Sequence, residues 1–338
     1  MFGGVTAVYQ QELHSGDDDQ SISGDLMFDL PTASGGWFLY LEASSGVSDG
    51  SIFNRYPGIN GDAGSVLDES GHSHLQVSEF HYRFDFDGAQ LTIGEIDPSA
   101  HLDRSRIAND ENTHFLSQGF VNNPTIQFPD YTPGIMYRIT AQERRPEVTV
   151  IVASSDGIAD NPTRSYRDLI DVSAAGKGVF AAAGARWFLD ETRIGVGTWL
   201  RTDKHEHVDD ANRTGKNYGA YFVYGKAYGP QIINFRLGLA NEKVSRVARF
   251  ASVAYEREFA AGSLGLGYSR FFESGRARSA ASGDSDHVET WFRAPLVGES
   301  LQVTGSLQYL SNPGFDSTGI TAERHALIAG IRLDYSFQ

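Results

Sequence analysis

Clusters of histidine and acidic residues are the first candidates for chemistry in this chain. The segment 205–207 (His-Glu-His) precedes Asp209 and Asp210, and His72 lies near His74. Imidazole and carboxylate groups can bind a metal ion, but a stable site needs several converging ligands and hydrogen bonds that orient them. Both clusters lie in segments expected to be polar external loops. Solvated side chains are therefore the simpler interpretation, and no metal or cofactor is predicted.

Catalytic motifs are not found either. The chain has no Gly-x-Ser-x-Gly element, no His-Glu-x-x-His motif, no phosphate-binding P-loop and no dinucleotide fingerprint. An enzyme at the rim of a β-barrel could use His14, Asp156, His205 and Asp209, but the sequence does not show that these residues converge. We therefore predict no enzymatic activity.

Charged side chains that alternate with aromatic ones are more informative. Residues 78–86 place four aromatic side chains on one face and Glu79, His81, Arg83 and Asp85 on the other. This period of two is that of a β-strand. One such strand fits either a soluble sandwich, which buries the aromatic face, or a membrane barrel, which places it in lipid.

Sixteen segments carry this pattern, and their length favours a membrane barrel. Most are about ten residues or longer, which suits a tilted strand in a bilayer, whereas strands of globular proteins usually have about 5–6 residues. We predict strands at 4–13, 20–30, 36–45, 74–86, 89–96, 133–142, 146–154, 177–189, 192–203, 216–227, 231–241, 246–259, 263–272, 286–295, 300–310 and 323–337.

The connections between these segments alternate in length. Every second connection is short, and the others are mostly long and polar, at 46–73, 97–132, 155–176, 204–215, 273–285 and 311–322. Membrane barrels have short periplasmic turns and long external loops. We therefore expect an all-β fold, a transmembrane antiparallel up-and-down barrel of sixteen strands, which forms one domain over residues 1–338. Both termini would then be periplasmic, in a Gram-negative outer membrane.

The composition of the chain limits which classes of molecule it can bind. The formal net charge is −15, which argues against a nucleic-acid partner because such a partner requires a basic face. Membrane lipid and lipopolysaccharide are the expected surroundings. The acidic run 17–19 is a candidate site for a divalent cation there, although a charged loop tip is the simpler interpretation. The sequence leaves the oligomeric state open between a homotrimer and a monomer.

Strand parity assigns the residues of the inner wall. A barrel of sixteen strands encloses an aqueous channel, in which charged side chains stay hydrated, pair, or create a transverse field that orients polar solutes. Inward glycines such as Gly265 and Gly267 would also allow a partner protein to plug the lumen. The predicted pore-lining residues of the wall are Arg83, Arg138, Arg186, Arg201, Arg236, Arg293, Arg332, Glu79, Glu289 and Trp199, and Arg193 has the same parity.

The third long connection, 97–132, differs from the other loops. It contains Phe115, Leu116, Phe120 and Phe128, so it is too apolar to be disordered. A connection of this length without regular structure is usually functional. We expect it to fold into the barrel and narrow the lumen to a constriction.

The same segment resembles a known family. The stretches 103–109, 115–116, 120–124 and 128–130 resemble the carbohydrate-selective porins of Gram-negative bacteria, the OprB-like porins. The resemblance implies a sixteen-stranded barrel, an inward-folded third loop and diffusion of sugars. It also implies that Arg104, Arg106, Asn109, Asn122 and Asn123 are positions of the constriction loop. These residues could instead serve only the architecture of the loop.

The leading hypothesis for function is passive diffusion of small polar solutes, which the resemblance narrows to sugars. An ion-selective channel is the first alternative, in which inward arginines would favour anions and the net negative charge would favour cations. A barrel whose lumen is plugged by a partner protein is the second alternative, and it would not conduct.

Overall fold

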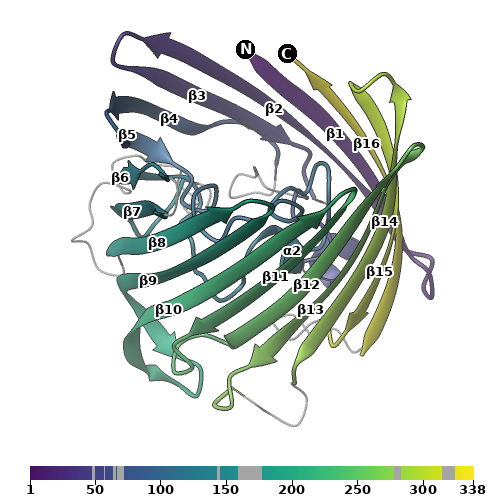
Figure 1. Ribbon diagram of the computed structural model, residues 1–338. Helices are drawn as coiled ribbons and strands as arrows, with labels where there is room; N and C mark the ends of the chain where they lie inside the picture. The colour runs from purple at the N-terminus through teal and green to yellow at the C-terminus, as the bar shows by residue number, and fades with distance from the viewer. Residues whose placement is uncertain are drawn as a thin grey trace.

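A computed structural model shows that the chain forms a closed barrel of sixteen antiparallel strands (Figure 1). Each strand pairs with its neighbours in the sequence, and β1 pairs with β16 to close the ring. The structure describes all residues except 48–49, 57, 64–65, 67–71, 143–144, 159–176, 278–282 and 314–323. The predicted fold is confirmed.

All sixteen predicted strands are present, with ends that differ from the prediction by a few residues except at β9 and β10. The strands are β1 (Phe2–Glu12), β2 (Asp18–Thr32), β3 (Gly35–Ser44), β4 (Leu75–Phe86), β5 (Ala89–Ile96), β6 (Thr132–Ile139), β7 (Glu147–Ser154), β8 (Val179–Leu189), β9 (Thr192–His207), β10 (Asp210–Tyr228), β11 (Gln231–Ala240), β12 (Val247–Phe259), β13 (Gly262–Glu273), β14 (Ser285–Val297), β15 (Leu301–Ser311) and β16 (His325–Phe337).

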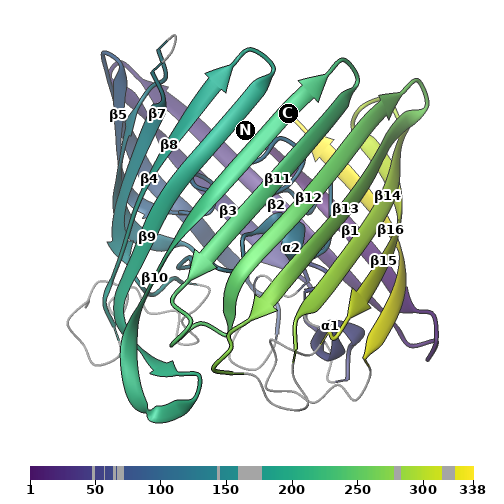
Figure 2. The same cartoon turned by 60° about the horizontal axis from the view of Figure 1, so that its bottom comes forward.

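The predicted loop 204–215 is wrong. β9 and β10 continue through this segment as a hairpin, with Gly215 paired to His205 and Asp210 paired to His207 across a register shift. Figure 2 shows this hairpin extending beyond the neighbouring strands. Both of its faces are polar because it stands outside the apolar belt of the barrel, so it lacks the alternation that marks the other strands. The histidines assigned to a loop therefore lie on β9.

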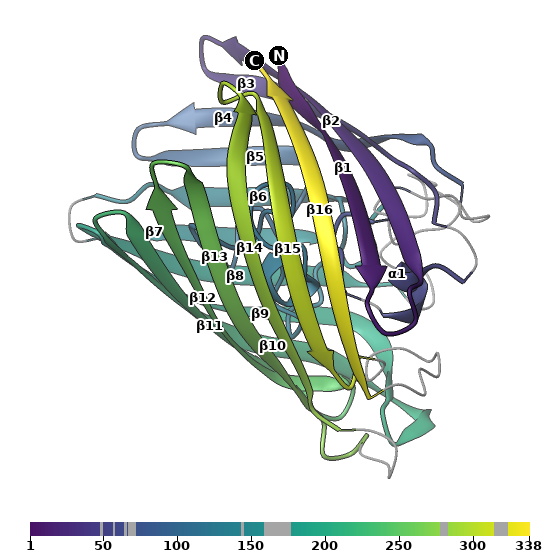
Figure 3. The same ribbon diagram turned by 90° about the vertical axis from the view of Figure 1, so that its right-hand side faces the viewer.

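The two ends of the barrel differ. Both termini lie side by side at one end, together with short turns such as 87–88, 190–191 and 260–261 (Figure 3). The other end carries the longer connections, of which 159–176 and 314–323 lie outside the described residues. We refer to these as the short-turn end and the long-loop end.

The outer surface carries exposed apolar side chains. On β11, Phe235, Leu237 and Leu239 are exposed, whereas Arg236 and Gly238 between them are buried on the inner side. The same alternation recurs along the other strands. An apolar outer band with a polar interior is the pattern of a barrel in a bilayer. In the described part of the chain, neither helix, α1 (Ile52–Arg55) nor α2 (Gln118–Val121), is long and apolar enough to cross a membrane.

The outward position of Leu266 allows a test of whether lipid surrounds the apolar band. Leu266 lies near the middle of β13, and Leu296 lies beside a turn at the short-turn end of β14. We expect Leu266→Arg to lower the free energy of unfolding in lipid vesicles by about 2–4 kcal/mol, and Leu296→Arg by about 0–1 kcal/mol. Urea titration of both variants checks this, and equal losses would argue against a bilayer around β13.

Candidate functional site

The third loop, which connects β5 to β6, crosses the interior of the barrel. Its residues contact Arg236 on β11, Glu289 on β14 and Arg332 on β16, which belong to the wall away from β5 and β6. Figure 1 shows the short helix α2 of this loop within the ring of strands. The loop therefore divides the lumen, and a solute that crosses the barrel must pass between the loop and the wall.

A buried ion pair fixes the loop to β11. The Nε of Arg236 donates to Oδ2 of Asp103 at 2.8 Å, and its Nη2 donates to the same carboxylate. Its Nη1 donates to the carbonyl oxygen of Phe120 at 2.7 Å. The side chains of Arg236 and Asp103 are each 1% exposed. Removal of one partner would leave a buried charge unpaired, so this contact resists any displacement of the loop.

Further charged groups hold the loop backbone at β14 and β16. The carboxylate of Glu289 accepts hydrogen bonds from the amides of Leu116 and Ser117 at 2.9 and 2.8 Å. Arg332 donates to the carbonyl oxygens of Glu111 at 2.5 Å and His114 at 2.9 Å. These bonds satisfy backbone groups that would otherwise be buried without partners.

Aromatic packing completes the attachment. The ring centroid of Phe115 lies 4.6 Å from that of Phe120 and 5.7 Å from that of Trp291. A side chain at Gly267 on β13 would meet the Phe120 ring at 2.6 Å, so the absence of a Cβ there allows the loop to approach the wall. The space beside this inward glycine, which could have received a partner protein, is filled by the chain's own loop.

Four predicted pore-lining residues of the wall are covered rather than exposed to the lumen. Arg236, Glu289, Arg332 and Trp199 point inward as parity required, but each is at most 2% exposed. The first three contact the third loop, and Trp199 lies in the apolar cluster under it. The expectation that they line the pore is thus wrong for these four, because a loop that fills the lumen covers the wall behind it.

The other predicted wall residues lie on the inner face and have partners of their own. Four of the arginines form ion pairs with carboxylates: Arg83 with Asp85 at 3.0 Å, Arg201 with Asp203 at 3.0 Å, Arg186 with Glu147 at 2.6 Å and Arg293 with Glu256 at 3.6 Å. Arg138 instead contacts the imidazole of His101 at 2.6 Å. The carboxylate of Glu79 accepts a hydrogen bond from the amide of Asp97 at 3.1 Å. Arg293 also donates to the carbonyl oxygen of Thr113 in the loop. Whether a solute contacts them stays a prediction.

The five predicted constriction residues divide into two groups. Asn109, which has a positive φ of 71°, binds the amide of Ser105 and the carbonyl of Val121, so it serves the loop's own structure. Asn123 is fully buried and binds Thr125 and the carbonyl oxygen of Leu237. The remaining three, Arg104, Arg106 and Asn122, line a cavity between the loop and the wall, as Asn109 also does, and they stay candidates for contact with a solute.

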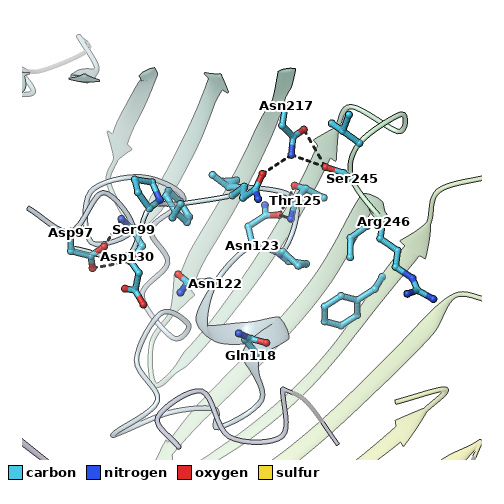
Figure 4. A pocket seen from close by; sticks show the side chains of 18 residues that line it. Asp97, Ser99, Gln118, Asn122, Asn123, Thr125, Asp130, Asn217, Ser245 and Arg246 are labelled. Atoms are coloured by element: carbon cyan, nitrogen blue, oxygen red, sulfur yellow. Dashed lines mark hydrogen bonds between the residues drawn. The ribbon is translucent and has the colours of Figure 1, made fainter. Parts of the chain in front are cut away.

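This cavity has a volume of about 530 Å³ and is lined by polar and charged residues. It shares several lining residues with a cavity of about 420 Å³ toward the long-loop end, which Figure 4 shows. It shares Asp110 with a cavity of about 490 Å³ beside the termini. The central cavity thus adjoins one cavity toward each end of the barrel. The central cavity is lined by Glu42, Gly61, Asp97, Ser99, Ala100, Arg104, Ser105, Arg106, Ala108, Asn109, Asp110, Glu111, His114, Gln118, Val121, Asn122, Asp130 and Tyr131.

Burial changes the charge of the acidic lining. Burial, together with the nearby Asp62 and Asp110, raises the pKa of Glu111 to about 8. Burial also raises the pKa of Asp97. For His114, burial lowers the pKa, but hydrogen bonds to Asp110 and Glu256 outweigh it and the net shift is upward. Near neutral pH the cavity is therefore less negative than its carboxyl groups suggest.

The second loop also enters the lumen, which the sequence reasoning missed. Ile52, Tyr56 and Ile59 pack against Leu310 and Ile328 on the inner face of β15 and β16. Their spacing of four and three residues is an amphipathic pattern and was the available signal. Asp62 of the same loop accepts a hydrogen bond from Ser23 at 2.6 Å, which places another carboxyl group near the cavity.

The rim residues considered for catalysis are held separately. His14 contacts Glu12 at 3.1 Å, Asp156 contacts Lys177 at 3.2 Å, His205 contacts Asp203 at 3.1 Å and Asp209 contacts Arg276 at 3.0 Å. None of these described contacts joins two of the four candidates. Within the described residues, no group of three or more histidine, aspartate and glutamate side chains is arranged to hold a metal ion.

Comparison with solved structures identifies the fold. OprB of Pseudomonas putida superposes with a TM-score of 0.74 at 13% identity, over 99% of this chain and 93% of that chain. A variant of the Rh. blastica porin has a TM-score of 0.59 at 12% identity, over 100% and 99% of the two chains. OmpT of Vibrio cholerae has a TM-score of 0.57 at 13% identity, over 99% and 96%.

The sixteen-stranded barrel of this chain thus shares its fold with these proteins. No protein-family model and no curated protein sequence matches it. The likeness is therefore one of structure, and it includes the OprB structure whose family the third loop resembles in sequence.

The buried pair of Arg236 and Asp103 predicts a large effect of mutation. Arg236→Met leaves Asp103 buried without its partner, so we expect the free energy of unfolding to fall by about 3–5 kcal/mol. We also expect larger fluctuations of single-channel current, because the loop loses its attachment to β11. Urea titration in lipid vesicles and recordings in planar bilayers measure the two effects.

The control is Arg83→Met, since Arg83 pairs with Asp85 where both side chains are about 40% exposed. That change should cost about 0–1 kcal/mol. The double variant Arg236→Met with Asp103→Leu should recover most of the stability, because it removes the unpaired charge as well. Equal losses for Arg83→Met and Arg236→Met would contradict the role given to the buried pair.

The raised pKa of Glu111 predicts a pH-dependent selectivity. Below about pH 8 this group is neutral, and above that value it adds a negative charge to the central cavity. We expect the preference for cations to increase as the pH rises through this range. Zero-current potentials in a salt gradient on either side of about pH 8 measure it.

Glu111→Gln should flatten this increase, although the loss of a proton from His114 leaves a smaller change of the same sign. Glu299→Gln, in the exposed turn before β15, is the matched control and should leave the increase intact. An unchanged pH profile in Glu111→Gln would show that this group does not control the charge of the cavity.

Proposed function

We propose that this chain is an outer-membrane porin through which small polar solutes, sugars foremost, diffuse passively. The observation that carries the proposal is the polar cavity of about 530 Å³ between the third loop and the wall, with adjoining cavities toward both ends. Its volume is in the range of about 300–1,000 Å³ that is common for small-molecule sites. Likeness to OprB of Pseudomonas putida supports the assignment.

The lining suits neutral hydroxylated solutes. Arg104 and Arg106 provide hydrogen-bond donors, while Glu42 and Asp130 provide acceptors in the same cavity. The side-chain amides of Gln118 and Asn122 offer both. A sugar with donors and acceptors around its ring can exchange bonds with water for bonds with these groups step by step, so passage needs no energy source.

The proposal also includes an orientation. The long-loop end would face the exterior, and the short turns and both termini would face the periplasm, as is usual for bacterial barrels. Lipid and lipopolysaccharide would surround the apolar band, and the protein would act as a monomer or a homotrimer. Chemical cross-linking in native membranes distinguishes these two assemblies.

The test is conductance of purified protein in a planar bilayer, with glucose or maltose added. We expect open channels whose current falls in a concentration-dependent way as sugar enters the cavity. Protein of confirmed folding, judged by its heat-modifiable migration on a gel, serves as the sample. Folded protein that does not conduct would overturn the porin assignment, and strong ion selectivity without any sugar effect would favour an ion channel.

A matched pair of variants locates the sugar effect. Asn122→Ala removes an amide from the lining of the central cavity, so it should weaken sugar block. Asn109→Ala is unsuitable as a control because Asn109 holds the loop itself. Asn212→Ala, in the exposed start of β10, removes an amide outside the cavity and should leave the block unchanged.

A further inference from the structure

Five arginines gather on the side of the lumen that β6, β8 and β9 form. Arg138 is the residue before the last of β6, Arg186 lies near the end of β8, and Arg193 is the second residue of β9, so all three are toward the short-turn end. Arg104 and Arg106 approach them from the third loop, and Arg104 shares a small cavity with Arg186. We call these five residues the arginine wall.

The arginine wall has few counter-charges. Glu147 pairs with Arg186 at 2.6 Å, and Glu191 lies 3.7 Å from Arg106 but is 69% exposed in a turn, where an ion pair is weak. The contact of Arg138 is with the imidazole of His101 at 2.6 Å. Burial, aided by Arg138 and Arg104, lowers the pKa of His101 to about 3, so this partner is neutral. The arginine wall therefore keeps a net positive charge.

Several of its donors also lack acceptors. Within the described residues, the Nε groups of Arg138, Arg186 and Arg193 are buried and have no hydrogen-bond partner. The guanidinium groups of Arg186 and Arg193 lie 4.9 and 5.6 Å from the ring centroid of Phe188, and these cation–π contacts help to hold them in place. The protein thus leaves these guanidinium groups incompletely hydrogen-bonded, and because the three side chains are only partly buried, each can still donate to an oxyanion that enters beside it.

We propose that the arginine wall binds the carboxylate or phosphate group of a small anionic solute, such as a sugar acid or a sugar phosphate. The planar guanidinium group offers two parallel N–H donors, which match the oxygens of either group. This inference rests on the proposed diffusion of small solutes and narrows their class. The hydroxyl groups of the same solute would face the central cavity, which Arg104 and Arg106 also line.

This site also explains how an acidic protein can pass an anion. The net charge of −15 belongs to the whole chain, whereas the arginine wall is locally positive. Fields in a narrow, low-dielectric passage are determined by the nearest charges, because salt screens more distant exposed ones within about 8 Å at physiological ionic strength. Exposed carboxyl groups far from this site thus weigh less than the five guanidinium groups, and only the acidic residues of the central cavity, such as Asp97 and Asp110, lie close enough to compete with them.

The experiment compares glucose, gluconate and glucose 6-phosphate as blockers of single-channel current through the full-length protein. We expect half-block by at least one of the two anions at a concentration roughly tenfold lower than by glucose, since charge-assisted hydrogen bonds are stronger than neutral ones. Preference for gluconate identifies a carboxylate site, and preference for glucose 6-phosphate identifies a phosphate site. Equal block by all three solutes would overturn the inference.

The variant Arg138→Gln with Arg193→Gln removes two charges of the arginine wall that have no carboxylate partner among the described ion pairs and that do not line the central cavity. It should abolish the preference for the anion while glucose still blocks. Arg83→Gln is the matched control, because Arg83 lies on the same inner face but pairs with Asp85, and it should keep the preference.

The two proposals fail in different ways. If glucose and ions pass but the anions have no advantage, the porin assignment stands and the anion site falls. If the folded protein does not conduct at all, the porin assignment falls first. An anion preference that survives in the double variant would place the responsible charges elsewhere and also overturn the arginine wall.

Discussion

Closure of the strand ring is the constraint on which the rest of the structure depends. A bilayer offers no hydrogen-bond partners, so every backbone group within it must be paired inside the protein, and a barrel achieves this only when its first and last strands meet. β1 and β16 pair along ten residues, from Gly3 with Phe337 to Glu12 with Ile328. Closure forces alternate side chains inward on every strand. A ring of sixteen strands is too wide for these side chains to fill, and the remaining space must hold water or other parts of the chain.

The third loop occupies part of that space, and buried charges hold it there. A loop of apolar residues alone would have no defined position in a polar lumen. Arg236, Glu289 and Arg332 supply directional bonds to one carboxylate and to backbone groups of the loop, while Phe115 and Phe120 supply contact area. The position of the loop therefore explains why inward charged residues of the wall differ in their exposure. Those behind the loop act as attachment points, and those elsewhere on the wall pair mainly with neighbouring side chains.

The sequence predicted the barrel well because one physical cause, the boundary between lipid and lumen, acts on nearly every strand. It failed where that cause is absent. The hairpin at 204–215 stands outside the apolar belt, so both of its faces are polar and its sequence does not alternate between apolar and polar residues. Parity correctly placed Arg236 and Trp199 on the inner side, but it carries no information on what covers them. The second loop was missed for the same reason, since burial of Tyr56 depends on contacts with β15 and β16 that are distant in sequence.

The remaining question is how one passage can serve both neutral and charged solutes. Burial keeps Glu111 protonated near neutral pH, which reduces the negative charge of the central cavity. The arginines cannot respond in this way, because a guanidinium group stays charged at any physiological pH. Desolvation therefore acts unequally on the two signs of charge. It neutralises Glu111, although at Asp110 burial is outweighed by hydrogen bonds with His114 and Thr113 that lower its pKa, and it leaves the guanidinium groups charged. A cavity with more carboxyl groups than guanidinium groups therefore need not repel anions.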